Sequence, residues 1–296
     1  MNQFIELLIN GISLGFVYAL VALGFVVIFK SSRVVNFAHG SIVLFGAFVI
    51  AKLADDLGFL LAVLVGVVLT GVLAALVYNF VLRHVRGRAA DTVTIATIGV
   101  DIILATELGR QIGQEVLNIG DPWTDKVVHF GEFSVPEARV AAAVVALVLL
   151  GAFLAAFKYS PWGVAMRAAA EDGEAAALMG IRLRRVAVGA WLVAGGLAAV
   201  GAVFLSTFPT PGVDRTSGLV ALSAFPAAIL GGLDSVLGAI VGGLVIGVVV
   251  TMSAGYQDEI AFLGRGLGQV APYVVMVAVL LVRPSGLFGT RELTRV

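Results

Sequence analysis

The 296-residue sequence contains no cysteine, which excludes disulfide bonds and thiolate metal sites. Its three histidines, at positions 39, 84 and 129, do not have the spacing of a metal site. Charged residues make up 13% of the chain and apolar residues 60%, whereas soluble domains are about a quarter charged. Together with a mean hydropathy of +1.05, this scarcity of charge predicts a polytopic membrane protein.

The chain also lacks the signatures of an enzyme. Basic and acidic residues balance at 19 each, so net charge favours neither a nucleic-acid nor an acidic partner. No sequence of the form G-x-x-x-x-G-K-[ST] occurs, so any ATP must be hydrolysed by another chain. No nucleophile with a base and an orienting group is recognisable, and a membrane enzyme would need such a polar cluster.

Nine apolar segments have about the length that a hydrocarbon core of roughly 30 Å requires. The first is too long for a signal-peptide core and has no basic residues before it, so we expect a retained spanning helix. The nine segments together predict one all-α transmembrane domain over residues 1–296, with about eight to nine spans. The segments at 35–52, 92–108 and 218–231 are short and could be half-helices or re-entrant pieces. The full set is 4–29, 35–52, 58–82, 92–108, 139–157, 186–208, 218–231, 235–253 and 269–282.

Lysines and arginines are distributed unequally over the connections between these segments. One alternating set of connections holds thirteen of them, whereas the other set holds Lys52, Arg110, Lys126, Arg139, Arg215 and Arg265. The positive-inside rule then places the N-terminus outside and the C-terminus in the cytoplasm. The extracytoplasmic loop 109–139 contains a partly alternating run at 126–135, which fits either a small strand pair or an irregular cap.

The longest basic-flanked polar interruption, residues 158–185, falls on the predicted cytoplasmic side. Alanines after Gly163 predict one short helix, and Asp172 is a candidate N-cap for a second at 173–178. Gly180 would supply the left-handed residue that ends it. An ordered helical loop at this place predicts a docking element for a soluble partner. The alternative is a solvated connector that lies on the lipid headgroups.

Glycines at helical spacing, such as Gly11 with Gly15 and Gly243 with Gly247, predict close helix packing in the membrane. Two stretches interrupt the apolar texture, VVNFAHGS at 34–41 and the segment from Pro226 to Ser235. Paired interruptions point to a substrate path in transporters, although a cytoplasmic turn with a helix cap would also explain the first.

Asp101 and Glu107 are the carboxylates within the apolar segments. Intramembrane carboxylates are costly, so Asp101 raises the possibility of a proton relay. A hydrogen bond to Thr94 or Thr97, or to a neighbouring helix, would also account for it. Glu107 lies near the outer end of its segment, where exposure to water explains it.

Five stretches, in order along nearly the whole chain, resemble the LivH-type permeases, the membrane subunits of ATP-binding-cassette importers for branched-chain amino acids. The most specific are NFAHG at 36–40 and GVAMRAAAEDGEAAALMGI at 163–181. The resemblance begins at Gly11 and also includes TIATIG at 94–99, AFPAAILGGLDSVLGAIVGG at 224–243 and RPSGLFG at 283–289. The family often has glycines before NFAHG, where this chain has Lys30-Ser31-Ser32-Arg33.

The resemblance implies a permease for Leu, Ile and Val that binds no cofactor and uses ATP hydrolysed by two cytoplasmic ATPases. It also implies a homologous LivM-like permease subunit and an extracytoplasmic amino-acid-binding protein. Related permeases for urea, short amides or other amino acids share most of these motifs, so the substrate stays open. An ion-coupled secondary transporter would explain Asp101, but it has no need of the helical loop at 158–185.

Three sets of residues are predicted to carry the function, and no catalytic or metal-binding residue is expected. A zwitterion that crosses without deep cations needs amide, hydroxyl and helix-terminus dipoles, which predicts a pathway along Asn36, His39, Thr94 and Thr97. Contact with the ATPases is predicted for Arg167, Ala168, Asp172, Glu174, Met179, Gly180 and Ile181. Polar contacts with the binding protein are predicted for Asp121, Asp125, Asp258 and Glu259.

Overall fold

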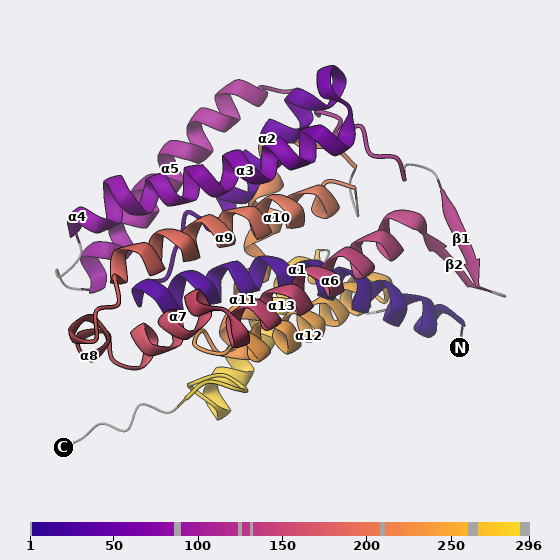
Figure 1. Cartoon of the computed structure of the whole chain (residues 1–296). Coiled ribbons are helices and arrows are strands. Elements are labelled where there is room, and N and C mark those ends of the chain that lie inside the picture. The colour runs from indigo at the N-terminus through magenta and orange to yellow at the C-terminus, as the bar shows by residue number, and fades with distance from the viewer. Residues whose placement is uncertain are drawn as a thin grey trace.

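The computed structural model describes residues 2–85, 90–123, 126–130, 133–207, 211–259 and 266–290. These residues form a bundle of helices with one short pair of strands (Figure 1). In chain order the elements are α1 (Asn2–Ser32), α2 (His39–Leu57), α3 (Phe59–Val77), the π-helical turn η1 (Tyr78–Leu82), α4 (Arg83–Val85), α5 (Ala90–Ile112), β1 (Val127–Phe130), β2 (Phe133–Pro136), α6 (Glu137–Tyr159), α7 (Pro161–Glu171), α8 (Gly173–Leu178), α9 (Leu183–Leu205), α10 (Ser217–Leu222), α11 (Ala224–Gly231), α12 (Val236–Gly255) and α13 (Leu267–Val282).

Six helical stretches are long and apolar enough to cross a membrane: Gln3–Ser32, Phe59–Val85, Thr92–Ile112, Glu137–Tyr159, Leu183–Leu205 and Val236–Gly255. Two shorter apolar stretches, Ser217–Gly231 and Leu267–Val282, add to them. The remaining predicted segment is α2, whose last turns carry Lys52, Asp55 and Asp56. Each of the nine predicted segments therefore corresponds to a helix or a helix pair, and the all-α polytopic class is confirmed.

Two of the segments predicted to be short or broken have different outcomes. Segment 92–108 is not a half-helix, because α5 continues for 23 residues to Ile112. Its last turns are polar but helical, since Arg110 donates to the Glu107 carboxylate at 2.7 Å on the helix surface. Segment 218–231 is broken at Ser223, between α10 and α11, and the predicted interruption from Pro226 to Ser235 contains the turn between α11 and α12, residues 232–235.

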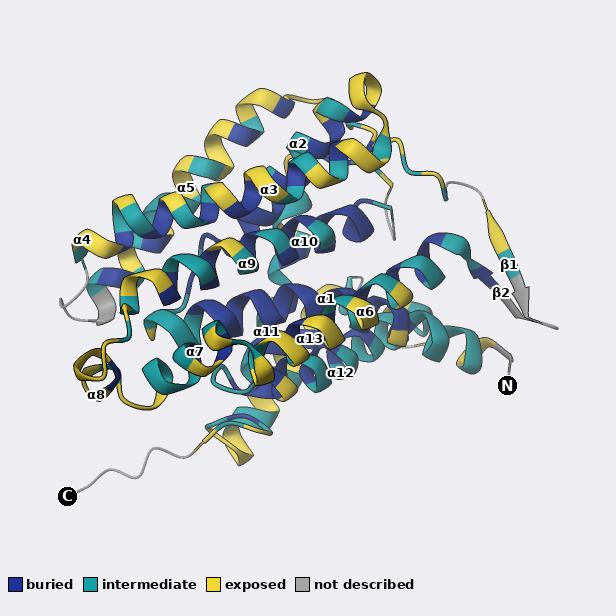
Figure 2. Cartoon of the chain, viewed as in Figure 1, coloured by how far each residue is buried: buried dark blue, intermediate teal, exposed yellow. Residues whose placement is uncertain are grey.

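Helix α1 lies in the middle of the bundle, and its residues from Val17 to Ile28 are almost all buried (Figure 2). It packs most extensively against α12, and this contact depends on glycines. A Cβ atom at Gly15 would lie 2.7 Å from the Leu244 Cα, and one at Gly243 would lie 2.5 Å from the Ala19 nitrogen. The packing role predicted for these glycines is therefore confirmed.

The helices run between two ends of the bundle (Figure 1). One end carries the N-terminus and the antiparallel pair of β1 and β2, in which Val128 is paired with Val135; we call it the strand end. The opposite end carries α7 and α8, residues 161–178, which we call the helical hairpin, and we call this the hairpin end. Along the sides, α3, α5 and α6 expose apolar residues such as Val68, Ile102 and Val148. These surfaces suit contact with lipid.

Candidate functional site

The connection between α1 and α2 enters the bundle as a non-helical segment. Arg33, with φ of 56°, ends α1 in a left-handed conformation, and α2 does not begin until His39. The Asn36 side chain accepts a hydrogen bond from the Ala38 nitrogen at 3.1 Å. The Phe37 nitrogen donates to Thr97 Oγ1 of α5 at 3.2 Å. These two side chains satisfy backbone groups that a continuous helix would have paired internally.

The first turn of α2 lies well inside the bundle. The His39 ring packs on Gly24 of α1, where a Cβ atom would lie 2.6 Å from His39 Nε2. Gly24 precedes the end of α1 by eight residues, which is roughly 12 Å along a helix. The N-terminus of α2 is therefore deep in the membrane-spanning part and not at its surface.

The break between α10 and α11 meets α2 at this same depth. A Cβ atom at Gly40 would lie 2.9 Å from both the Gly218 oxygen and the Leu222 Cγ, so only glycine allows this approach. Ser223, which separates the two helices, lies beside Tyr18 of α1. Two interruptions far apart in sequence therefore meet in space, and we call this region, residues 33–41 and 218–225, the junction.

Aromatic side chains surround the junction. The Phe25 ring lies 4.4 Å from the His39 ring and 5.4 Å from that of Phe225, measured between centroids. Phe37 lies 5.6 Å from Phe225 on the other side. Phe37 and Phe225 are only half-buried, whereas His39 is 1% exposed. The junction thus combines an apolar aromatic wall with the backbone of interrupted helices.

The structure brings together three of the four residues predicted for the pathway. Thr97 donates to the Thr94 carbonyl at 2.8 Å and contacts the segment that Asn36 stabilises. Asn36 and Thr97 are buried, and Thr94 is half-buried. His39 points to the other side, toward α1, where its ring packs against Gly24 and Phe25.

Asp101 receives a hydrogen bond from Ser41 in the first full turn of α2. This is the neighbouring-helix explanation considered for that carboxylate, and it links α5 to the junction. The described residues contain no group of three or more His, Cys, Asp or Glu side chains that could hold a metal ion.

The helical hairpin has the local structure predicted for residues 158–185. Ser160 caps α7, and the Asp172 side chain accepts hydrogen bonds from the Glu174 and Ala175 nitrogens at 2.9 and 3.0 Å, which starts α8. Gly180 has φ of 86°, and the Ile181 nitrogen donates to the Ala176 carbonyl at 3.0 Å, as in a left-handed helix end.

The residues predicted to contact the ATPases divide into two groups. Asp172, Glu174, Met179 and Gly180 are exposed, and Met179 is 84% exposed although it is apolar. Ala168 and Ile181 are half-buried. Arg167 turns inward, because its guanidinium donates to the Phe157 and Lys158 carbonyls at the end of α6.

Two basic residues connect α1 to the rest of the hairpin end. The Arg33 guanidinium donates to the Ala170 carbonyl of α7. Lys30 Nζ donates to the Asp234 carbonyl at 2.6 Å, in the turn between α11 and α12. The segment that leads into the junction is thus bonded directly to the helical hairpin. The sequence had shown these positions only as a departure from the usual glycines.

At the strand end, Asp258 and Glu259 are exposed in the turn after α12, and Asp121 is half-buried. Asp125 lies outside the described residues. Loop 113–123 is joined to the start of α10 by two backbone hydrogen bonds between Leu117 and Val213, at 2.9 and 2.8 Å. Burial raises the pKa of the nearby Asp214 carboxyl, but hydrogen bonds from Thr216 and Ser217 outweigh it and hold that pKa below its usual value.

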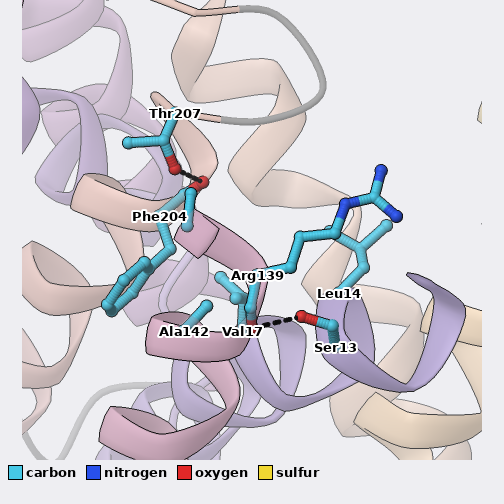
Figure 3. Close-up of a pocket in the computed structure, with 8 residues that line it drawn as sticks. Ser13, Leu14, Val17, Arg139, Ala142, Phe204 and Thr207 are labelled. Carbon is cyan, nitrogen blue, oxygen red and sulfur yellow. Dashed lines mark hydrogen bonds between the residues drawn. The ribbon is translucent and has the colours of Figure 1, made fainter. Parts of the chain in front are cut away.

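A small pocket near the strand end contains a residue whose burial the sequence did not reveal (Figure 3). Arg139, expected to be a loop charge, is only 8% exposed near the start of α6. Its carbonyl accepts a hydrogen bond from Ser13 Oγ at 2.7 Å, which joins α6 to α1. The pocket volume of about 10 Å³ has room for at most one water molecule, so it is a packing feature and not a ligand site.

Interrupted helices that meet inside a multi-pass bundle are a feature of membrane transporters. The family "Branched-chain amino acid transport system / permease component" matches residues 7–282, and the chain belongs to this family. It is therefore a non-catalytic membrane subunit of the ATP-binding-cassette transporters.

Relatives from several organisms match over most of their length. The chain is 30% identical to the "High-affinity branched-chain amino acid transport system permease protein LivH" of Escherichia coli strain K12, over 99% of this chain and 98% of that protein. It is 30% identical to the "Probable branched-chain amino acid transport permease protein LivH" of Methanocaldococcus jannaschii, over 91% and 88%. BraD of Pseudomonas aeruginosa is 28% identical, over 99% and 98%.

Proposed function

We propose that this chain is the membrane subunit of an ATP-driven importer that moves Leu, Ile or Val across the bacterial cytoplasmic membrane. The observation that carries the proposal is the meeting of two interrupted segments at the junction. Interrupted helices present helix-terminus dipoles, and the side chains of Asn36 and Thr97 add amide and hydroxyl groups, for the ammonium and carboxylate of an amino acid. The half-buried rings of Phe37 and Phe225 would accommodate an aliphatic side chain. The names of the relatives support the same substrate class.

The proposed orientation has the strand end outside and the hairpin end in the cytoplasm, with the N-terminus outside. It follows from the excess of lysine and arginine at the hairpin end. The partners would be a homologous LivM-like permease subunit, two cytoplasmic ATPases and an extracytoplasmic amino-acid-binding protein. The binding protein would dock near Asp121, Asp125, Asp258 and Glu259, where charge contributes mainly to steering.

The helical hairpin would dock in a groove of an ATPase through its exposed surface. The flexible Met179 side chain is exposed and could fill an irregular apolar pocket on the ATPase. Leu178 beside it is 88% exposed. Arg167 was predicted to contact the ATPases. Because its guanidinium donates to carbonyls at the end of α6, we assign it instead to holding the hairpin in position. The bond from Arg33 to Ala170 would transmit movement of the docked hairpin to the junction.

A reconstituted transport assay tests the proposal. The chain, its co-purified subunits and the binding protein are placed in proteoliposomes with radiolabelled leucine, urea or acetamide. We expect leucine uptake with ATP and none with a proton or sodium gradient alone. Uptake of urea or acetamide in preference to leucine would show that the assigned substrate is wrong. Gradient-driven uptake without ATP would contradict the mechanism.

The pathway is tested separately with the double variant Asn36→Ala and His39→Ala. We expect lower leucine uptake with the complex still assembled, because the variant removes polar groups at the junction. Loss of the Asn36 hydrogen bond costs about 1 kcal/mol, which a large membrane complex should tolerate. Uptake at the wild-type level would exclude both residues from the pathway.

A further inference from the structure

A pocket of about 580 Å³ opens at the hairpin end, at the level where α1 and α6 end and α12 begins. Its walls come from the end of α1, the end of α6 with the adjoining α7, and the start of α12. The segment after α13 closes one side. The pathway and the docking surface described above do not use this pocket.

The lining of the pocket is rich in positive charge. Lys30, Lys158 and Arg167 lie in it, against a single carboxylate, that of Asp234. The Asp234 carboxylate is already engaged, because Oδ2 accepts a hydrogen bond from the Thr290 nitrogen at 3.0 Å. With three cations and one carboxylate, the lining has a net positive charge that an anion would neutralise.

Two of the cations are held in place around one aromatic ring. Lys30 Nζ and the Arg167 guanidinium lie 5.9 and 5.4 Å from the centroid of the Phe157 ring. Their bonds to the Asp234 and Phe157 carbonyls use part of their donors and leave others for a ligand. Positions fixed in this way reduce the entropy that a ligand must overcome on binding.

Part of the remaining lining is apolar and belongs to the spanning helices α6 and α12. Leu154 precedes the end of α6 by about one turn, and Leu237, in the first turn of α12, is 59% exposed. Cations at the ends of spanning helices, with exposed apolar side chains along the same helices, match a phospholipid, whose charged headgroup continues into acyl chains.

We propose that this pocket binds an anionic phospholipid, with its phosphate between Lys30, Lys158 and Arg167 and its acyl chains along Leu154 and Leu237. In the proposed orientation the lipid belongs to the cytoplasmic leaflet. Because α7 forms one wall, the bound headgroup would also support the helical hairpin. Inorganic phosphate shares the headgroup chemistry but lacks the acyl chains.

Lipid binding to the full-length chain in mild detergent tests the proposal. Phosphatidylglycerol and phosphatidylcholine with identical acyl chains are compared by native mass spectrometry, with inorganic phosphate as a competitor. The wild type should retain phosphatidylglycerol preferentially, and Lys30→Gln with Lys158→Gln should lower this preference by roughly five-fold for each cation removed. Arg184→Gln, at the same end but outside the pocket, should leave it unchanged.

Lys158→Gln alone guards against a folding defect, because the Lys158 side chain is exposed. This single variant should lower the preference for phosphatidylglycerol by about half as much as the double variant does, on a logarithmic scale. Equal retention of the two lipids by the wild type, or an unchanged preference in both Lys variants, would overturn the proposal. Displacement of phosphatidylglycerol by inorganic phosphate at millimolar concentration would assign the pocket to free phosphate and also overturn it.

Discussion

Arg33 is the one described residue other than glycine with a positive φ, and its guanidinium bonds to Ala170 of the helical hairpin. A left-handed conformation costs a non-glycine residue roughly 1–2 kcal/mol, so an arginine here is retained at some cost to stability. We predict that Arg33→Gly relieves this strain and removes the bond at the same time. Thermal stability should stay near the wild-type value, and ATP-driven leucine uptake should fall several-fold.

Two further substitutions separate backbone from side chain at this position. Arg33→Asn tolerates the left-handed conformation but is too short to reach Ala170, so it should behave like Arg33→Gly. Arg33→Lys keeps a long cationic donor and should retain most of the uptake. Full uptake in Arg33→Gly would show that the bond is not part of coupling.

Gly15 gives a prediction about stability. Its missing Cβ atom would lie 2.7 Å from the Leu244 Cα, which is backbone and cannot move aside. Gly15→Ala should therefore destabilise the contact between α1 and α12 by about 1–3 kcal/mol and lower the melting temperature in detergent. The matched control is Gly151→Ala on α6, where a Cβ atom meets nothing within 4 Å and helix propensity improves. Equal melting temperatures for the two variants would contradict the packing argument.

At the residue scale, the sequence predicts what depends on near neighbours. The glycine pairs could be recognised because close packing requires small residues at helical spacing. The hydrogen bond from Arg33 to Ala170 joins residues 137 positions apart, so no local sequence pattern predicts it. Arg139 was misjudged for a related reason: its position at the end of a span suggested a loop charge, and its burial depends on α1 and the pocket around Ser13.

At the element scale, the helical hairpin yields a prediction about docking. A side chain at Gly180 would meet nothing within 4 Å, so its space is open and only its φ of 86° penalises substitution, by roughly 1–2 kcal/mol. We predict that Gly180→Arg reaches the membrane but loses ATP-driven uptake and co-purification of the ATPases. Gly180→Asn, which tolerates the conformation with less bulk, should retain more of both. Normal co-purification of Gly180→Arg would favour a connector on the headgroups.

The elements differ in how well the sequence predicted them. The hairpin followed from local signals, since Asp172 caps α8 and Gly180 ends it. The predicted interruption from Pro226 to Ser235 contains the turn between α11 and α12, where Gly231 ends α11. The break between α10 and α11 was not located, because Ser223 is not a strong helix breaker, and Pro226 is tolerated in the first turn of α11. At this break Gly218 approaches Gly40 closely, a tertiary contact that no local sequence pattern reveals.

At the scale of the whole molecule, the junction connects the two ends of the bundle. It is reached from the hairpin end through residues 33–38, which Arg33 ties to α7. From the strand end it is reached through α10, whose start is held by Asp214 and by the bridge between Leu117 and Val213. Contacts therefore connect both ends of the bundle to the two interrupted segments, an arrangement that would suit alternating access.

The orientation of these two ends in the membrane is itself a prediction, and the absence of cysteine makes it easy to test. Met179→Cys places one thiol on the helical hairpin, and Glu259→Cys places one at the strand end, both at exposed positions. In intact cells a membrane-impermeant maleimide should label Glu259→Cys and not Met179→Cys. In inverted membrane vesicles stripped of the ATPases, which would otherwise cover Met179, the pattern should reverse. The cysteine-free parent controls for background, and labelling of Met179→Cys in intact cells would place the hairpin outside and contradict both the orientation and ATPase docking.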